Sequence, residues 1–91
     1  MYEAEYYTAS WCQPCKTFKP LAMKVFTEAG IPLKFNDVDD DEGGSKSVLN
    51  HVASIPTVIV YRKDEGGWYE VDRITGAFPE QNLRTRLDKL G

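Results

Sequence analysis

Two cysteines separated by two residues, Cys12 and Cys15, are the part of this chain best suited to chemistry, and they are its only cysteines. The segment before them, residues 1–8, has a strand-like composition, and the segment after them, residues 16–29, has a helical pattern. These patterns predict that Cys12 lies at a helix N-terminus, where free backbone N–H groups and the helix dipole favour a thiolate over a thiol. Because the thiolate is the reactive form of cysteine, this placement indicates thiol–disulfide chemistry.

A cysteine pair with this spacing can also form half of a zinc site. Structural zinc takes four ligands, and His51 is the only histidine that could join the pair. The redox interpretation is therefore preferred, and no metal is expected. The acidic run 37–42 does not fit a calcium loop, because Glu42 stands where glycine is required and Val48 where the terminal acid belongs. We expect this run to be a solvated turn that caps the following helix.

The composition restricts the class of protein. A chain of 91 residues is expected to form one domain, 1–91, around one core. Eleven basic and fourteen acidic residues give a net charge of −3, which argues against nucleic acid or an anionic membrane as partner, since both require a basic face. No apolar stretch is as long as a membrane span, and the acidic N-terminus lacks a secretory-signal pattern. We therefore expect a reducing, cytoplasmic location, where a lone cysteine pair is typically redox-active or metal-binding.

The elements that must position the cysteines can be predicted from local patterns. Strands are expected where aromatic and β-branched residues cluster, and the last two should form a hairpin: residues 2–8, 33–38, 57–61 and 68–74. Helices are expected at residues 16–29, 45–52 (with Val48, Leu49 and Val52 turned inward) and 79–90. The resulting order, β-α-β-α-β-β-α, predicts an α/β fold in which a four-stranded mixed sheet carries helices on both faces.

Three segments, in this order, resemble the thioredoxin family. The first is similar to the family's active-site segment and kinked helix: Trp11-Cys12-Gln13-Pro14-Cys15-Lys16, with Pro20 five residues after the second cysteine. The second, Ser54-Ile55-Pro56-Thr57, is similar to the family's Ile-Pro-Thr element. The third, Thr75-Gly76-Ala77, is similar to the glycine region at the edge of the substrate surface. The three segments span most of the chain, and the resemblance implies a thioredoxin-like fold.

The resemblance also implies a function, that of a protein dithiol–disulfide oxidoreductase. Cys12 would attack the target disulfide, and Cys15 would resolve the mixed disulfide. The residues expected to bind substrate are Trp11, Gln13, Pro14, Ile55, Pro56 and Gly76. The resemblance also implies a cis peptide bond between Ile55 and Pro56. The expected partners are thioredoxin reductase or a similar electron donor, and disulfide-containing proteins such as ribonucleotide reductase. We expect a monomer with no cofactor beyond the Cys12–Cys15 disulfide.

The sequence departs from the family pattern at several points. It begins at the active-site strand, without the strand and helix that usually come first, and in this it is closer to glutaredoxins. Gln13 replaces the usual glycine between the cysteines. Tyr6 stands six residues before Cys12, where thioredoxins place a buried aspartate, and Phe35 stands where that aspartate has a lysine neighbour. Two alternative functions therefore stay open: a glutaredoxin-like donor that uses glutathione, and a thioredoxin-fold binding subunit of a larger complex.

Overall fold

The fold places the cysteine pair just beyond the end of a central strand. The computed structural model describes residues 1–90, and Gly91, the last residue of the predicted domain, lies outside the described residues. One sheet, in the order β2-β1-β3-β4, is formed by β1 (Tyr2–Thr8), β2 (Leu33–Asp37), β3 (Thr57–Asp64) and β4 (Gly67–Thr75). Strands β1 and β2 are parallel, whereas β3 is antiparallel to β1 and β4. The predicted mixed sheet and its hairpin are confirmed.

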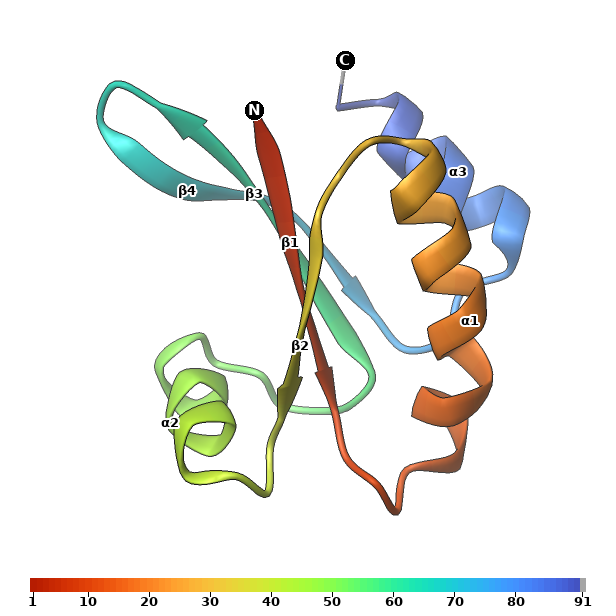
Figure 1. Cartoon of the computed structure of the whole chain (residues 1–91), viewed down its shortest axis with the longest axis vertical. Coiled ribbons are helices and arrows are strands. Elements are labelled where there is room, and N and C mark those ends of the chain that lie inside the picture. The colour runs from red at the N-terminus through yellow and green to blue at the C-terminus, as the bar shows by residue number, and fades with distance from the viewer. Residues whose placement is uncertain (91) are drawn as a thin grey trace.

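The helices lie on both faces of the sheet (Figure 1). Helices α1 (Gln13–Glu28) and α3 (Glu80–Asp88) lie side by side on one face. Helix α2 (Asp41–Leu49) lies on the other face and contacts β2. The element order and the two-sided arrangement of helices therefore agree with the prediction.

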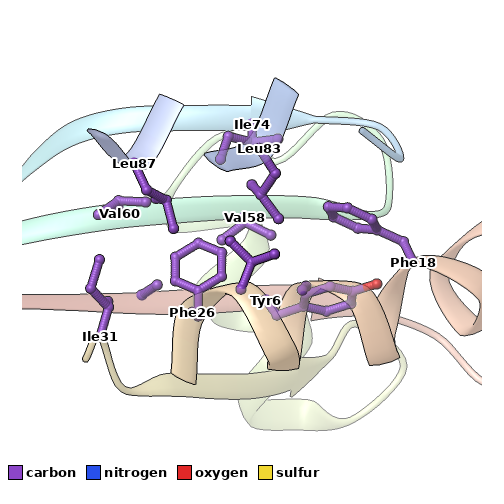
Figure 2. Packing of buried hydrophobic residues seen from close by; sticks show 12 residues of the cluster. Tyr6, Phe18, Phe26, Ile31, Val58, Val60, Ile74, Leu83 and Leu87 are labelled. Carbon is purple, nitrogen blue, oxygen red and sulfur yellow. The ribbon is translucent and has the colours of Figure 1, made fainter. Parts of the chain in front are cut away.

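The main core lies between the sheet and the helix pair α1 and α3. Alternate residues of a strand point to opposite faces, so one face of β1 and β3 supplies apolar side chains to this core. Figure 2 shows Tyr6 of β1 and Val58 of β3 packed with Phe26 of α1 and Leu83 of α3. All four side chains are completely buried. Because burying a large apolar side chain contributes roughly 1.5–3 kcal/mol, this packing fixes β1 and thereby the start of α1 that follows it.

The predicted helix 45–52 is wrong at both ends. Helix α2 spans Asp41–Leu49 and therefore includes Gly43, which lies before the predicted start of the helix. Gly43 is buried, and a Cβ atom there would overlap the backbone carbonyl of Asp37. This glycine therefore allows a close approach of α2 to the end of β2. Asp40 precedes the helix as its N-cap residue but makes no side-chain capping bond, so the predicted cap is also wrong.

The predicted inward face of α2 is wrong as well. Val48 and Leu49 are 75% and 76% exposed, and Val52 lies beyond the helix and is half-buried. Instead, Lys46 and Asn50 donate hydrogen bonds to side chains of β1. Residues four apart share one face of a helix, so α2 turns a polar face toward the sheet and its apolar pair toward solvent.

Candidate redox site

The two cysteines form a disulfide at the start of α1, with Cα atoms 5.3 Å apart. Cys12 is the N-cap residue and has an extended backbone, whereas Cys15 lies in the first turn of the helix. The backbone N–H of Cys15 donates a 3.2 Å hydrogen bond to Cys12 Sγ. The predicted position of Cys12 at a helix N-terminus is confirmed.

The local sequence accounts for this helix start. Pro14 occupies the first turn of α1, where its fixed φ suits a helix and its missing N–H has no helical partner to lose. The N–H of Cys12 donates to the carbonyl of Ala9 at 3.1 Å, and the N–H of Lys16 donates to the carbonyl of Cys12 at 3.2 Å. These two bonds fix the backbone on either side of Cys12, and the helix begins at Gln13, directly after it.

Both cysteines are buried, and Cys12 is the less deeply buried of the two. Cys15 is completely buried, whereas Cys12 is 5% exposed. Both pack with Ala9 in a small apolar cluster, against which Val38 and Ile55 also pack. The first turn of α1 has no acidic residue to offset the positive end of the helix dipole. A thiolate at position 12 would therefore be stabilised by the helix N-terminus and by the N–H of Cys15.

Two segments distant in sequence meet beside the disulfide. The Ile55–Pro56 peptide bond is cis, which confirms the prediction. Cys12 Sγ lies 3.9 Å from the carbonyl oxygen of Ile55, and since a disulfide sulfur carries no hydrogen, this is a van der Waals contact. Gly76 has a φ of +88°, which favours glycine, and donates its N–H to the carbonyl of Pro56 at 2.8 Å. The structure thus brings together the cysteine pair, the Ile-Pro element and Gly76.

The other predicted surface residues lie next to Cys12 in the chain and are exposed. Gln13 and Pro14 face solvent, and Trp11 is 67% exposed. The indole Nε1–H of Trp11 donates a 2.8 Å hydrogen bond to Asp39 Oδ2. We did not predict a role for Asp39, which belongs to the acidic run after β2. The signal that could have indicated this contact is the parallel pairing of β1 and β2. The C-terminal ends of parallel strands meet at the same edge of a sheet, so Trp11 and Asp39, which follow these two strands, come close together there.

Tyr6 lies behind the disulfide, at the position where the resemblance would place a buried carboxylate. It is completely buried, and its hydroxyl donates a 2.7 Å hydrogen bond to the backbone carbonyl of Cys15. Burial raises the pKa of Tyr6 to about 12, so the phenol stays protonated near neutral pH. Phe35 is its partner on β2, with ring centroids 5.2 Å apart. This site therefore holds a neutral hydrogen-bond donor next to the first turn of α1.

Two further findings concern metal ions and membranes. Among residues 1–90, no group of three or more His, Cys, Asp or Glu side chains is arranged to hold a metal ion. His51, considered as a zinc ligand, follows α2 with a φ of 54° and is exposed. In the same part of the chain, no helix is both long and apolar enough to cross a membrane.

Comparison with known proteins identifies the family. The family model described as Thioredoxin matches residues 5–89. The chain belongs to the thioredoxin family. It is 35% identical over 81 residues to a thioredoxin of Staphylococcus epidermidis, which covers 89% of this chain and 74% of that protein. A thioredoxin of Staphylococcus aureus is 33% identical over the same length, with the same coverage of both proteins.

Solved thioredoxins share the fold. The structure of Trichomonas vaginalis thioredoxin superposes with a TM-score of 0.83 at 20% identity, covering 99% of this chain and 79% of that one. Fasciola hepatica thioredoxin gives a TM-score of 0.78 at 27% identity, covering 97% of this chain and 79% of that one. The thioredoxin-like fold is thereby confirmed. Family membership and the Cys12–Cys15 disulfide together make this chain a thiol–disulfide oxidoreductase, and the two alternative functions are not favoured.

Proposed function

We propose that this oxidoreductase is a general reductant of protein disulfides, with Cys12 as the attacking residue and Cys15 as the resolving residue. The observation that carries the proposal is the position of Cys12 at the N-cap of α1. There the helix dipole and the Cys15 N–H favour the thiolate, which is the nucleophile in disulfide exchange. Cys15 is completely buried behind it, so an incoming disulfide reaches Cys12 first.

The proposed reaction moves two electrons in two displacement steps. The Cys12 thiolate attacks one sulfur of the target disulfide; the target S–S bond breaks, one target cysteine leaves as a thiolate, and a mixed disulfide forms. Cys15 then loses its thiol proton to solvent and attacks Cys12 Sγ. This step forms the Cys12–Cys15 disulfide and releases the second target thiolate. Both target thiolates take up protons, so the target disulfide is reduced to two thiols as the protein dithiol is oxidised.

We assign substrate binding to the surface around Cys12, which comprises Trp11, Gln13, Pro14, Ile55, Pro56 and Gly76. The support is their position: the Ile55 carbonyl contacts Cys12 Sγ, and Gly76 is hydrogen-bonded to Pro56. An extended target segment could form backbone hydrogen bonds at this edge while its disulfide meets Cys12. Trp11, which directly precedes Cys12 in the chain, adds an exposed aromatic ring.

The proposed electron donor is thioredoxin reductase or a similar dithiol enzyme, and the targets are disulfide-containing proteins. Ribonucleotide reductase is one such target by family resemblance. The two electrons are carried by the Cys12–Cys15 pair itself, so the reaction requires no further cofactor. We expect a monomer in a reducing compartment such as the cytoplasm, where a dithiol can be kept reduced between turnovers.

Insulin reduction with two electron sources tests the proposal. We expect turnover with thioredoxin reductase and NADPH, and much slower turnover with glutathione, glutathione reductase and NADPH. Activity with glutathione alone would overturn the proposal and support a glutaredoxin-like donor. The Cys12→Ser/Cys15→Ser double variant supplies the second arm. If wild type reduces insulin with neither source and the double variant keeps the cellular role, the chain acts as a binding subunit.

A further inference from the structure

Tyr6 contacts the redox pair from behind, through the 2.7 Å hydrogen bond from its hydroxyl to the Cys15 carbonyl. This bond joins β1 directly to the first turn of α1. The ring of Tyr6 packs against Phe18, with centroids 6.0 Å apart, and against Phe35, with centroids 5.2 Å apart. Because the ring is completely buried between these neighbours, the hydroxyl has a fixed position.

The bond restrains the backbone that supplies a hydrogen bond to Cys12 Sγ. The carbonyl that Tyr6 contacts belongs to the peptide group between Cys15 and Lys16. The N–H of that peptide group donates to the Cys12 carbonyl at 3.2 Å, so the group is held at both ends. On the other side of Cys15, the preceding peptide N–H donates to Cys12 Sγ at 3.2 Å. Fixing the peptide group between Cys15 and Lys16 limits rotation at Cys15. It thereby keeps the N–H of the preceding peptide group directed at Cys12 Sγ.

We propose that Tyr6 is a positioning residue for the redox pair, which stabilises the Cys12 thiolate and thereby sets the reduction potential. This inference rests on the proposed role of Cys12 as the attacking thiolate. A hydrogen bond to a thiolate is stronger than one to a disulfide sulfur, because the thiolate is charged. A well-directed N–H therefore stabilises the reduced protein more than the oxidised protein, which makes the pair a stronger oxidant. Loss of the Tyr6 hydroxyl should make it a stronger reductant.

The Tyr6→Phe variant removes the hydroxyl and keeps the ring. The Cys15 carbonyl would keep its helical donor, the N–H of Lys19, so the variant is expected to fold. Tyr2→Phe is a matched control, because Tyr2 also lies on β1 and its hydroxyl also donates to a backbone carbonyl, that of Leu90, at 2.5 Å. Tyr2 is at the end of β1 farther from the cysteines. Both variants should lower the urea midpoint of unfolding.

Only Tyr6→Phe should change the redox chemistry. We expect its equilibrium with the glutathione couple to shift roughly threefold to tenfold toward the disulfide form, where tenfold corresponds to about 30 mV for a two-electron couple. Alkylation of Cys12 by iodoacetamide near neutral pH should slow, because less of the thiol is ionised. Both quantities should stay at the wild-type value in Tyr2→Phe.

The outcomes separate this inference from the proposed function. If Tyr6→Phe is folded and has the wild-type potential and alkylation rate, Tyr6 is purely structural and the inference is overturned; a shift toward a stronger oxidant overturns it as well. If Tyr6→Phe does not fold, 3-fluorotyrosine at position 6 replaces it. This analogue keeps the ring and is a stronger donor, so it should shift the equilibrium toward the dithiol form, and an unchanged equilibrium would again overturn the inference. Absence of insulin turnover by wild type would instead count against the proposed function.

Discussion

The indole of Trp11 is tied to the carboxylate of Asp39 by a 2.8 Å hydrogen bond that bridges the ends of the parallel strands β1 and β2. The indole is nevertheless 67% exposed beside Cys12. The bond therefore holds an exposed aromatic ring in one orientation. Ordering a side chain on binding costs free energy, so a ring that is already ordered favours target binding.

Replacing Asp39 with alanine should release the Trp11 indole. We expect the KM for a protein disulfide to rise several-fold with kcat little changed. The loss of stability should be below about 1 kcal/mol, because the bond is exposed. Fluorescence anisotropy in a Trp68→Phe background reports the motion of Trp11 alone, since the chain has two tryptophans. Asp40→Ala is the matched control, and an unchanged KM despite a mobile indole would contradict the prediction.

The two thiols of the reduced protein should react differently. Cys12 is at the helix N-terminus and retains 5% exposure, whereas Cys15 is completely buried. Iodoacetamide near neutral pH should therefore modify Cys12 first, as mapped by mass spectrometry. With a disulfide target, Cys15→Ser should accumulate a mixed disulfide at Cys12, and Cys12→Ser should accumulate little. Preferential modification of Cys15 would show that the two roles are reversed.

Gly43 should be far less tolerant of a side chain than a glycine in a turn. In Gly43→Ala the new Cβ would overlap the Asp37 carbonyl, so α2 must move away from β2. We expect a loss of roughly 1–3 kcal/mol in the free energy of unfolding, measured by urea titration. Gly66→Ala is the control, because its Cβ would meet only the flexible side chain of Asp64, at 3.4 Å. Equal stabilities of the two variants would mean that the close approach at Gly43 is not required.

Local patterns predict the individual strands and the position of the disulfide, because both depend on residues close in sequence. The β-branched run from Thr57 gave the central strand, and Thr57–Val60 are all buried. The order of a strand, the cysteine pair and a helical pattern was sufficient to place Cys12 at the N-cap. The Ile55–Pro56 bond was predicted from family resemblance and not from a local pattern.

The errors and omissions concern contacts between different elements of the fold. The predicted helix excludes Gly43, because the contact of this glycine with Asp37 exists only when α2 packs on β2. The roles of Tyr6 and Asp39 depend on which groups the folded chain places opposite them, the Cys15 carbonyl and the Trp11 indole. A sequence identifies such residues as a phenol or a carboxylate, but it does not supply their partners.

Asp72 of β4 joins the sheet to α3 through Arg86. The Nε–H of Arg86 donates to Asp72 Oδ2 at 2.9 Å, and a second guanidinium nitrogen donates to Oδ1. Burial alone would raise the pKa of Asp72, but the hydrogen bonds from Arg86 and from the backbone N–H of Arg73 outweigh it and lower the pKa. The carboxylate therefore binds its proton less readily in the folded protein than in the unfolded chain.

This lowered pKa predicts a pH-dependent contribution to stability. It should be fully present above the unfolded pKa of about 4, and should be lost as pH falls through the lower folded value. We expect Asp72→Asn to be less stable than wild type by about 1 kcal/mol near neutral pH, and the difference to shrink in strong acid, as measured by urea unfolding at several pH values. Glu70→Gln is the comparison, because Glu70 also has a lowered pKa, chiefly from the hydrogen bonds of Arg73. The side chain of Glu70 is 39% exposed, against 17% for Asp72, so the loss of stability in Glu70→Gln should be smaller. A stability difference between wild type and Asp72→Asn that is constant from neutral to strongly acidic pH would show that the ion pair with Arg86 does not contribute through its charge.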